Sequence, residues 1–246
     1  MGACCTKNTN QESHLNLEAN NVDYEQEKIE VKKEMQRLRE ETTSPGLNSS
    51  YISDNESSSD LAFKKIEVER NRKFCHNLVK EINLMRTKPQ NYLKKIEYYE
   101  QFIRILENNS VIFEFENKVY QMNGTESYEE LASFLDPSQQ MSSLEFKDEL
   151  VISLPNDPSL IQSYDYMANQ FVMKKLGLSN KYTNFTFHYD INTRNPELSA
   201  FFQLLDDSNV NRQRRRNLLN PYYDSIGVSI GRISNDKYCC YIVLGG

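Results

Sequence analysis

Four arginines fall within five positions near the C-terminus, at Arg212, Arg214, Arg215 and Arg216. A guanidinium group stays charged at physiological pH and donates paired hydrogen bonds to phosphate or carboxylate oxygens. One interpretation of this run is a contact with anionic lipid headgroups or phosphate. The other is a solvated helix end held by local salt bridges, and the residues leave both open. Because the run is short and lacks interleaved aromatic residues, we predict that it does not bind nucleic acid.

The first six residues, MGACCT, match the pattern M-G-x-x-x-[ST] for N-myristoylation of Gly2. Cys4 and Cys5 lie close to that glycine and are candidate sites of S-palmitoylation. A single myristoyl chain binds membranes only marginally, whereas a second acyl chain makes anchoring stable. The sequence therefore predicts lipidation at Gly2, Cys4 and Cys5, and an unmodified N-terminal tip is the alternative.

The predicted acyl chains determine the expected location of the protein. We expect a peripheral protein on the cytoplasmic face of a membrane, such as the plasma membrane, the Golgi or a cilium. Its partner there is the membrane itself, contacted through the acyl chains. The sequence has no run of about 18 apolar residues that would span a bilayer. Its N-terminus also lacks the apolar core of a signal peptide.

The charge of the chain is unevenly distributed. The 246 residues carry 29 basic and 35 acidic side chains, for a net charge of −6. Residues 1–60 hold 6 of the basic and 12 of the acidic side chains, so they account for the whole net charge. The mean hydropathy of −0.70 is low for a chain that is globular throughout. These figures predict one folded domain preceded by a solvated acidic segment.

The remaining cysteines do not have the spacing of a disulfide framework or a zinc site. Cys75 falls in a helical pattern, while Cys239 and Cys240 are neighbours in a strand pattern. Adjacent side chains on a strand point to opposite faces of the sheet, so we expect these two thiols on opposite faces. We predict no metal ion and no cofactor.

The N-terminal quarter divides into three segments. Residues 1–22 form the predicted acylated flexible tail, and residues 43–60 are a Ser- and Asn-rich linker by composition. Between them, residues 23–42 form a charged helix in which Val31, Met35 and Leu38 have the spacing of a heptad seam. Residues 24–41 therefore either bind a partner helix or form a solvated charged helix.

Residues 61–246 form the predicted folded domain. Its first helix carries an apolar stripe of Phe74, Leu78, Ile82 and Met85. Pro89 marks the start of a second helix, whose predicted apolar face continues through Tyr92, Ile96, Tyr99, Ile103 and Leu106.

The rest of the domain shows both the alternation that is typical of strands and the spacing that is typical of helices. Residues 110–124 alternate as a strand or hairpin, and residues 127–135 form a short helix capped by Thr125 or Ser127. Residues 157–178 are predicted as one amphipathic helix. A further helix starts at Asn195 and Pro196, and two strands end the chain. Helices followed by a C-terminal hairpin indicate the α+β class.

Three stretches together resemble the CAP superfamily, which includes the cysteine-rich secretory and pathogenesis-related proteins. LVKEINLMRTKPQNYLKKIE at residues 78–97 is similar to the family's opening helix, with its Asn-x-x-Arg turn and following Pro. Residues 131–150 resemble the segment before the next helix in protist-type and bacterial-type members. Residues 204–231 resemble a third motif of the family. In order, that motif has two acidic residues, a short loop, the sequence Arg-Gly-His-Arg-x-Asn, an Asn-Pro pair and a strand. The final YIVLGG resembles the family's last strand.

This resemblance covers roughly residues 73–246. It implies an α-β-α sandwich with a central antiparallel sheet. It also agrees with the acylation motif, because some intracellular members of the family are similarly myristoylated and lie on cytosolic membrane faces.

The family's cleft usually presents two histidines and two glutamates, a donor set that can hold zinc. The resemblance places His188 at the first histidine and Arg214 at the second, and arginine cannot ligate a metal. Glu197, Asp206 and Asp207 are the carboxylates that remain near the motif. We therefore predict a relic cleft of His188, Glu197, Asp206 and Arg214 with no catalytic residue, in which Arg214 pairs with Asp206 or Asp207. For His188 itself, a hydrogen-bonded structural histidine and a metal ligand are the alternatives.

The same resemblance implies a structural role for Arg215, while Arg212 and Arg216 are expected on the exposed side. All three are nevertheless candidate contacts for anionic lipid or phosphate.

The leading hypothesis is a non-enzymatic, dually acylated, CAP-like domain that recognises lipid or a protein partner. The first alternative is a hydrolase or metal-dependent enzyme that uses a modified cleft around His188 with Glu197 or Asp206. The second is a scaffold in which residues 24–41 pair with a partner helix.

Overall fold

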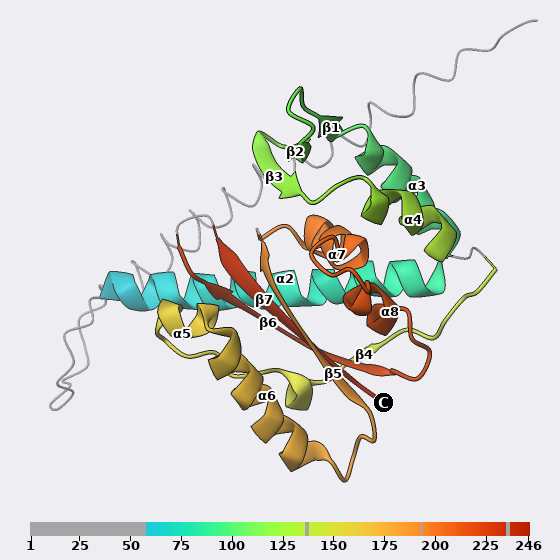
Figure 1. Cartoon of the computed structure of the whole chain (residues 1–246). Coiled ribbons are helices and arrows are strands. Elements are labelled where there is room, and N and C mark those ends of the chain that lie inside the picture. The colour runs from blue at the N-terminus through green and yellow to red at the C-terminus, as the bar shows by residue number, and fades with distance from the viewer. Residues whose placement is uncertain (1–57, 136–137, 193, 235–236) are drawn as a thin grey trace, which may run out of the picture. The chain divides into compact units, whose positions relative to one another are not determined.

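The computed structural model describes residues 58–135, 138–192, 194–234 and 237–246 (Figure 1). The predicted acylation motif, the charged helix of residues 24–41 and most of the 43–60 linker lie outside the described residues. Residues 70–246 form one compact unit. The described part of the preceding unit is the beginning of the first helix.

Helix α2 spans Ser58–Thr87 and helix α3 spans Pro89–Glu100. The predicted stripe of α2 is buried, and Pro89 is the first residue of α3, as the sequence indicated. The prediction that the apolar face of α3 continues to Ile103 and Leu106 is wrong. The helix ends at Glu100, because Ile103 pairs with Phe113 in a small sheet and Leu106 lies in the turn that follows.

That small sheet consists of β1 (Ile103–Ile105), β2 (Val111–Phe115) and β3 (Lys118–Met122), all antiparallel. It confirms the hairpin predicted in residues 110–124. Glu116 and Asn117 form the two-residue turn between β2 and β3, with φ values of 50° and 60°. Two consecutive positive φ values match the right-handed twist of the flanking strands.

The middle of the chain contains α4 (Glu126–Phe134), β4 (Glu145–Phe146), the 3-10 turn η1 (Asp148–Leu150), α5 (Pro158–Gln162) and α6 (Tyr164–Leu178). The single helix predicted for residues 157–178 is therefore two. Ser163 adopts an extended conformation between them, and its hydroxyl accepts a hydrogen bond from the backbone N–H of Tyr166. This capping bond stabilises the start of α6 and explains the break.

The C-terminal part contains β5 (Phe185–Asn192), α7 (Pro196–Leu205), α8 (Gln213–Leu218), β6 (Ser225–Arg232) and β7 (Tyr238–Gly245). Asn195 caps α7 as predicted, because its side-chain oxygen accepts hydrogen bonds from the backbone N–H groups of Glu197 and Leu198. The two terminal strands pair as a hairpin, also as predicted. Strand β5 was not predicted from the sequence.

The central sheet has the strand order β4-β6-β7-β5. The β6–β7 and β7–β5 pairs are antiparallel, but β4 joins β6 in parallel. The expectation of an antiparallel central sheet therefore holds only in part, because the short strand β4 enters from a long connection instead of a hairpin.

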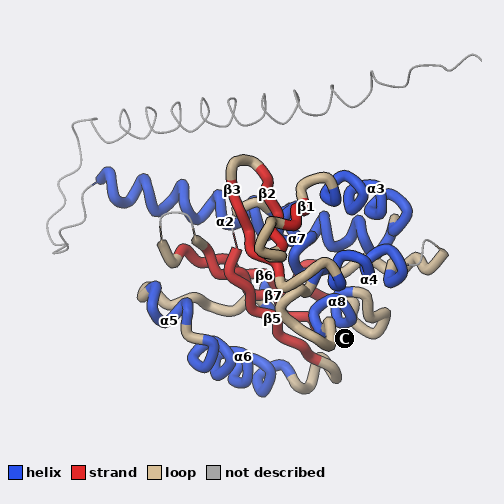
Figure 2. The backbone as a smooth tube through the Cα atoms, turned by 45° about the horizontal axis from the view of Figure 1, so that its top comes forward, coloured by secondary structure: helices blue, strands red, loops and turns tan. Residues whose placement is uncertain are grey.

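The two faces of this sheet support separate hydrophobic cores. Along β7, Cys240, Ile242 and Leu244 belong to the core that includes α2, α3 and α7. Cys239, Tyr241 and Val243 belong to the core that includes α5 and α6. The prediction that Cys239 and Cys240 face opposite sides is thus confirmed. Figure 2 shows helices on both sides of the sheet, so the protein is of the α+β class with a layered arrangement.

Among the helices of the described ranges, none is both long enough and apolar enough to span a bilayer.

Candidate functional site around His188 and Arg214

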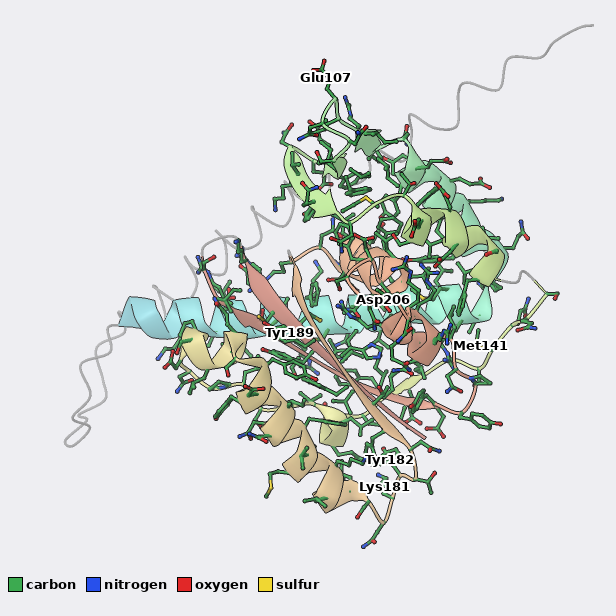
Figure 3. The ribbon with its side chains drawn as sticks, viewed as in Figure 1. Glu107, Met141, Lys181, Tyr182, Tyr189 and Asp206 are labelled. Carbon is green, nitrogen blue, oxygen red and sulfur yellow. The ribbon has the colours of Figure 1, made fainter. Side chains whose placement is uncertain are left out.

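The turn between α7 and α8 is organised by Asp206, which Figure 3 labels. Asp206 has a φ of 49°, in the left-handed region, and it ends α7. Its Oδ2 atom accepts hydrogen bonds from the backbone N–H of Arg214 at 2.8 Å and of Arg215 at 3.4 Å. The buried carboxylate therefore satisfies N–H groups at the start of α8, which would otherwise lack acceptors.

The side chain of Arg214 folds back over the same carboxylate. Its Nε atom lies 3.3 Å from Oδ1 of Asp206, and its Nη2 atom donates to Oγ of Ser208 at 2.6 Å. Burial raises the pKa of Asp206, while the charge of Arg214 acts in the opposite direction. The predicted pairing of Arg214 with Asp206 or Asp207 is confirmed for Asp206. Asp207 instead accepts a hydrogen bond from Oγ of Ser127.

His188 is a buried residue of β5. Its Nε2 atom lies 3.2 Å from Nδ2 of Asn217, which also donates to Thr186 Oγ1 at 2.7 Å. Gln213 donates to the Oδ1 atom of the same amide, so Nδ2 faces the imidazole and Nε2 is the acceptor.

The environment of His188 disfavours its charged form. Burial lowers its pKa to about 3, and the positive charge of Arg214 lowers it further, while a hydrogen bond with Gln203 opposes the shift. At neutral pH the ring is therefore an uncharged, hydrogen-bonded part of the interior. Among the alternatives for His188, this environment matches the structural histidine.

Glu197 does not join this cluster, which corrects the predicted relic cleft. It lies in the first turn of α7, whereas Asp206 ends that helix. The two residues are nine positions apart, which corresponds to about 13.5 Å along the helix axis. Glu197 is exposed and lies 3.4 Å from Nζ of Lys95, which itself contacts Glu81 at 2.7 Å.

Arg215 is completely buried, which agrees with the structural role expected for it; the prediction that it contacts lipid or phosphate is wrong. Its guanidinium donates to the carbonyl oxygens of Leu204 and Leu205 at the end of α7, and to that of Ser127. It also contacts the Glu130 carboxylate at 3.3 Å. A cation near carbonyl groups at a helix C-terminus is electrostatically favourable, and this arrangement connects α7, α8 and α4.

Arg212 is also largely withdrawn from solvent, contrary to the prediction. Its side chain is 13% exposed, and its Nε atom lies 3.0 Å from the Glu130 carboxylate. Its Nη1 atom donates to the carbonyl oxygen of Asn209. Of the three arginines proposed as lipid or phosphate contacts, Arg216 alone is exposed.

The Asn-x-x-Arg turn of α2 has a role that sequence reasoning did not assign. Arg86 is completely buried. It donates hydrogen bonds to four carbonyl oxygens, those of Ser142, Leu218, Asn220 and Tyr223. Burial lowers its pKa to about 10.

Asn83, one helical turn before Arg86, pairs with both the N–H and the C=O of Leu144. The spacing that places Asn83 and Arg86 on one helix face was visible in the sequence. Their acceptors were not, because they come from distant segments.

A cleft of about 790 Å³ lies elsewhere in the compact unit. Its lining consists of residues 142–147, Lys181, Tyr182, Asp224, Ser225 and Gly246. None of His188, Asp206 and Arg214 lines it. Its lysines are paired, Lys147 with Glu145 and Lys181 with Glu149, so they do not form a free cationic site.

The chemistry available around Arg214 is therefore limited. It holds a neutral imidazole, a paired guanidinium and a carboxylate that caps a helix. In the part of the chain that the structure describes, no group of three or more His, Cys, Asp or Glu side chains is arranged to hold a metal ion.

Comparisons with protein-family models, with curated proteins and with solved structures found no match in any of the three.

Proposed function

We propose that this chain is a non-enzymatic CAP-like domain that is held by acyl chains on the cytosolic face of a membrane. There it recognises a lipid or a protein partner. The observation that carries this proposal is the ion pair of Arg214 with Asp206 next to a neutral, buried His188. A fixed cation occupies the position where the resemblance implies a metal-binding histidine, and it is already neutralised within the fold.

The residues of the resembling motifs support the CAP-like part of the proposal. Asn83 and Arg86 of the first motif bind backbone groups of the segments around Leu144 and Leu218. Arg215 and Asn217 of the third motif bind the end of α7 and the His188 side chain. All four are buried or half-buried and join elements that are distant in sequence, as expected of residues that define a fold.

The chemistry of the cluster supports the non-enzymatic part. A general base must be able to exchange protons near the working pH. Burial lowers the pKa of His188 to about 3, and its Nε2 atom is held by a hydrogen bond from Asn217 within the fold. Arg214 cannot serve as a metal ligand.

The acylation motif supports the membrane part. MGACCT provides a myristoylation site at Gly2 and two adjacent cysteines for a second acyl chain. Two chains together give the stable anchoring that one chain does not.

Metabolic labelling with fatty-acid analogues, followed by cell fractionation, tests the anchor. We expect Gly2→Ala to abolish myristate incorporation and to move the protein to the soluble fraction. The double variant Cys4→Ser, Cys5→Ser should keep myristate but lose most membrane association, because one chain binds reversibly. Lys7→Ala is the matched control and should behave as wild type.

Detection should use an antibody, because the carbonyl group of Gly246 accepts hydrogen bonds from Thr183 and Asn184 and a C-terminal tag would disturb it. Membrane retention of Gly2→Ala would refute acyl anchoring.

Metal analysis of the purified protein tests the enzymatic alternative. We expect substoichiometric zinc in the wild type and no change in His188→Ala. Arg214→His restores the second imidazole of the implied ligand set and serves as the positive comparison. Stoichiometric zinc in the wild type that is lost in His188→Ala would support the metal-dependent enzyme instead.

A further inference from the structure

Residues 123–125 connect β3 to α4, and they contain the single Asn-Gly pair of the chain, Asn123–Gly124. Asparagine is a chemically labile residue. A following glycine makes it more so, because a residue without a Cβ atom lets its backbone nitrogen reach the preceding side chain. Asn123 is exposed. A Cβ atom at Gly124 would meet no atom within 4 Å, so the space beside this backbone is open.

In the part of the chain that the structure describes, the N–H group of Gly124 donates no hydrogen bond to the protein. The Asn-Ser pair at Asn109–Ser110 differs in this respect. There the N–H group of Ser110 donates to Oδ1 of Asn108 at 3.1 Å, and this bond restrains the nitrogen that would react. The local structure therefore distinguishes Asn123 from Asn109.

Asn123 attaches the β3–α4 connection to the segment between α7 and α8. Its backbone N–H donates to Oδ2 of Asp207, and its Nδ2 atom donates to the carbonyl oxygen of Asp207 at 3.2 Å. Oδ1 of the same carboxylate accepts a hydrogen bond at 2.9 Å from Oγ of Ser127, in the first turn of α4. Asp207 thus joins the start of α4 to the α7–α8 connection, and Asn123 supplies two of the donors.

We propose that Asn123 is a deamidation site whose conversion weakens the attachment of α4 to the α7–α8 connection. The backbone nitrogen of Gly124 gives up its proton and bonds to Cγ of Asn123. The Cγ–Nδ2 bond breaks, and the amide group leaves with that proton as ammonia. A water molecule then opens the five-membered imide. Cleavage of the new N–Cγ bond gives aspartate, whereas cleavage of the backbone C–N bond gives isoaspartate.

Both products remove a donor and add a negative charge beside Asp207. The new carboxylate cannot donate to the Asp207 carbonyl group, which loses a hydrogen bond. It also lies near the Asp207 carboxylate, and like charges at short range repel each other. Isoaspartate in addition lengthens the backbone by a methylene group and changes the path of the chain into α4. The inference goes beyond the proposed function and does not depend on acylation or on a membrane.

Incubation of the purified full chain in heavy-oxygen water, followed by peptide mass spectrometry, tests the reaction. We expect heavy oxygen to enter residue 123, and to enter faster in mildly alkaline than in mildly acidic buffer, because the nitrogen of Gly124 must lose its proton. Asn109 is the internal control and should stay unlabelled over the same period. Asn123→Gln should block labelling at this position, because glutamine would have to form a less favourable six-membered ring. Labelling of residue 123 in the urea-unfolded chain but not in the folded chain would overturn the proposal.

Hydrogen exchange of residues 126–134 tests the structural consequence. Asn123→Asp reproduces the charge of the product, and its α4 amides should exchange faster than those of wild type, because the helix detaches more often. High salt should reduce the difference, since the repulsion between exposed carboxylates is screened. Asn123→Gln is the matched control, because it keeps an amide donor and adds no charge. Equal exchange in wild type and Asn123→Asp would refute the effect of deamidation on α4.

Discussion

Arg86 shows how a buried cation can hold distant parts of a chain together without a buried carboxylate. Its guanidinium donates to carbonyl oxygens at four positions, 56 to 137 residues away in the sequence. Only arginine combines several donors with a rigid planar geometry, so a lysine at this position can satisfy few of these acceptors.

We predict that Arg86→Lys lowers the free energy of unfolding by about 3 kcal/mol or more. The reason is that buried carbonyl groups lose their donors, at about 1–3 kcal/mol for each unsatisfied group. Urea unfolding followed by circular dichroism measures this change. The control is Arg104→Lys, because the side chain of Arg104 is 63% exposed and its Nε atom lies 3.4 Å from the partly exposed carboxylate of Glu114. A similar small effect in both variants would contradict the structural role of Arg86.

His188 makes the stability of the fold depend on pH in a defined direction. Its pKa is about 3 in the folded protein, below the ordinary value of 6.5. Between these two values the unfolded chain binds a proton that the folded protein does not bind. Stability contributed by the neutral ring is therefore complete above pH 6.5 and is lost progressively as the pH falls toward 3.

We predict that the stability advantage of wild type over His188→Gln shrinks by about 2 kcal/mol between pH 6.5 and pH 4.5. Urea unfolding at several pH values measures it. The raised pKa of Asp206 acts in the opposite direction but is common to both proteins. His76→Gln is the matched control for replacing a histidine by glutamine, because His76 is exposed on α2. A constant difference between wild type and His188→Gln would mean that the ring takes up a proton without unfolding.

At the scale of elements, two glycines show how packing determines whether a side chain is tolerated. A Cβ atom at Gly227 of β6 would lie 2.3 Å from the carbonyl carbon of Leu150, so η1 passes directly over the strand. A Cβ atom at Gly177 of α6 would have no neighbour within 4 Å.

We predict opposite effects for alanine at these positions. Gly227→Ala should destabilise the protein by about 3 kcal/mol, because the backbone of η1 must move away from the sheet. Gly177→Ala should stabilise it by up to about 1 kcal/mol, because alanine restricts the unfolded chain and favours the helix. Thermal unfolding of both variants and of wild type measures whether each substitution lowers or raises the stability. Destabilisation by Gly177→Ala would show that the end of α6 packs against a further surface.

At the scale of the whole molecule, β7 is the element that both cores share. It lies between β6 and β5 in the sheet, and its alternate side chains enter the two cores. Cys75 and Cys240 are buried in one core and Cys239 in the other. Burial also raises the pKa of Cys75 to about 12, which suppresses its reactive thiolate form.

We predict that these three thiols become reactive together. In a variant with Cys4 and Cys5 replaced by serine, alkylation should be slow in buffer and should rise for all three thiols at the same urea concentration. The reason is that disrupting β7 removes a wall from both cores, so the unit unfolds cooperatively. Mass spectrometry of the labelled peptides measures each site. Earlier labelling of Cys239 alone would indicate that the α5–α6 side opens independently.

The sequence by itself determined the features that depend on neighbouring residues. Asn195 and Pro196 located the start of α7, the alternation in residues 110–124 located the β2–β3 hairpin, and adjacency placed Cys239 and Cys240 on opposite faces. These follow from local geometry, because capping, strand alternation and helical spacing act over a few residues.

Tertiary structure alone decided which charged groups are buried and what they bind. Arg212, Arg215 and Arg216 were all candidate contacts for lipid or phosphate in the sequence, yet Arg215 is enclosed by carbonyl groups of α7 and α4, while Arg216 remains exposed. The lowered pKa of His188 likewise depends on burial in the assembled fold and on the charge of Arg214, which lies more than twenty residues away along the chain. A charge can be buried only where distant segments supply its hydrogen-bond partners, and that supply is a property of the assembled fold.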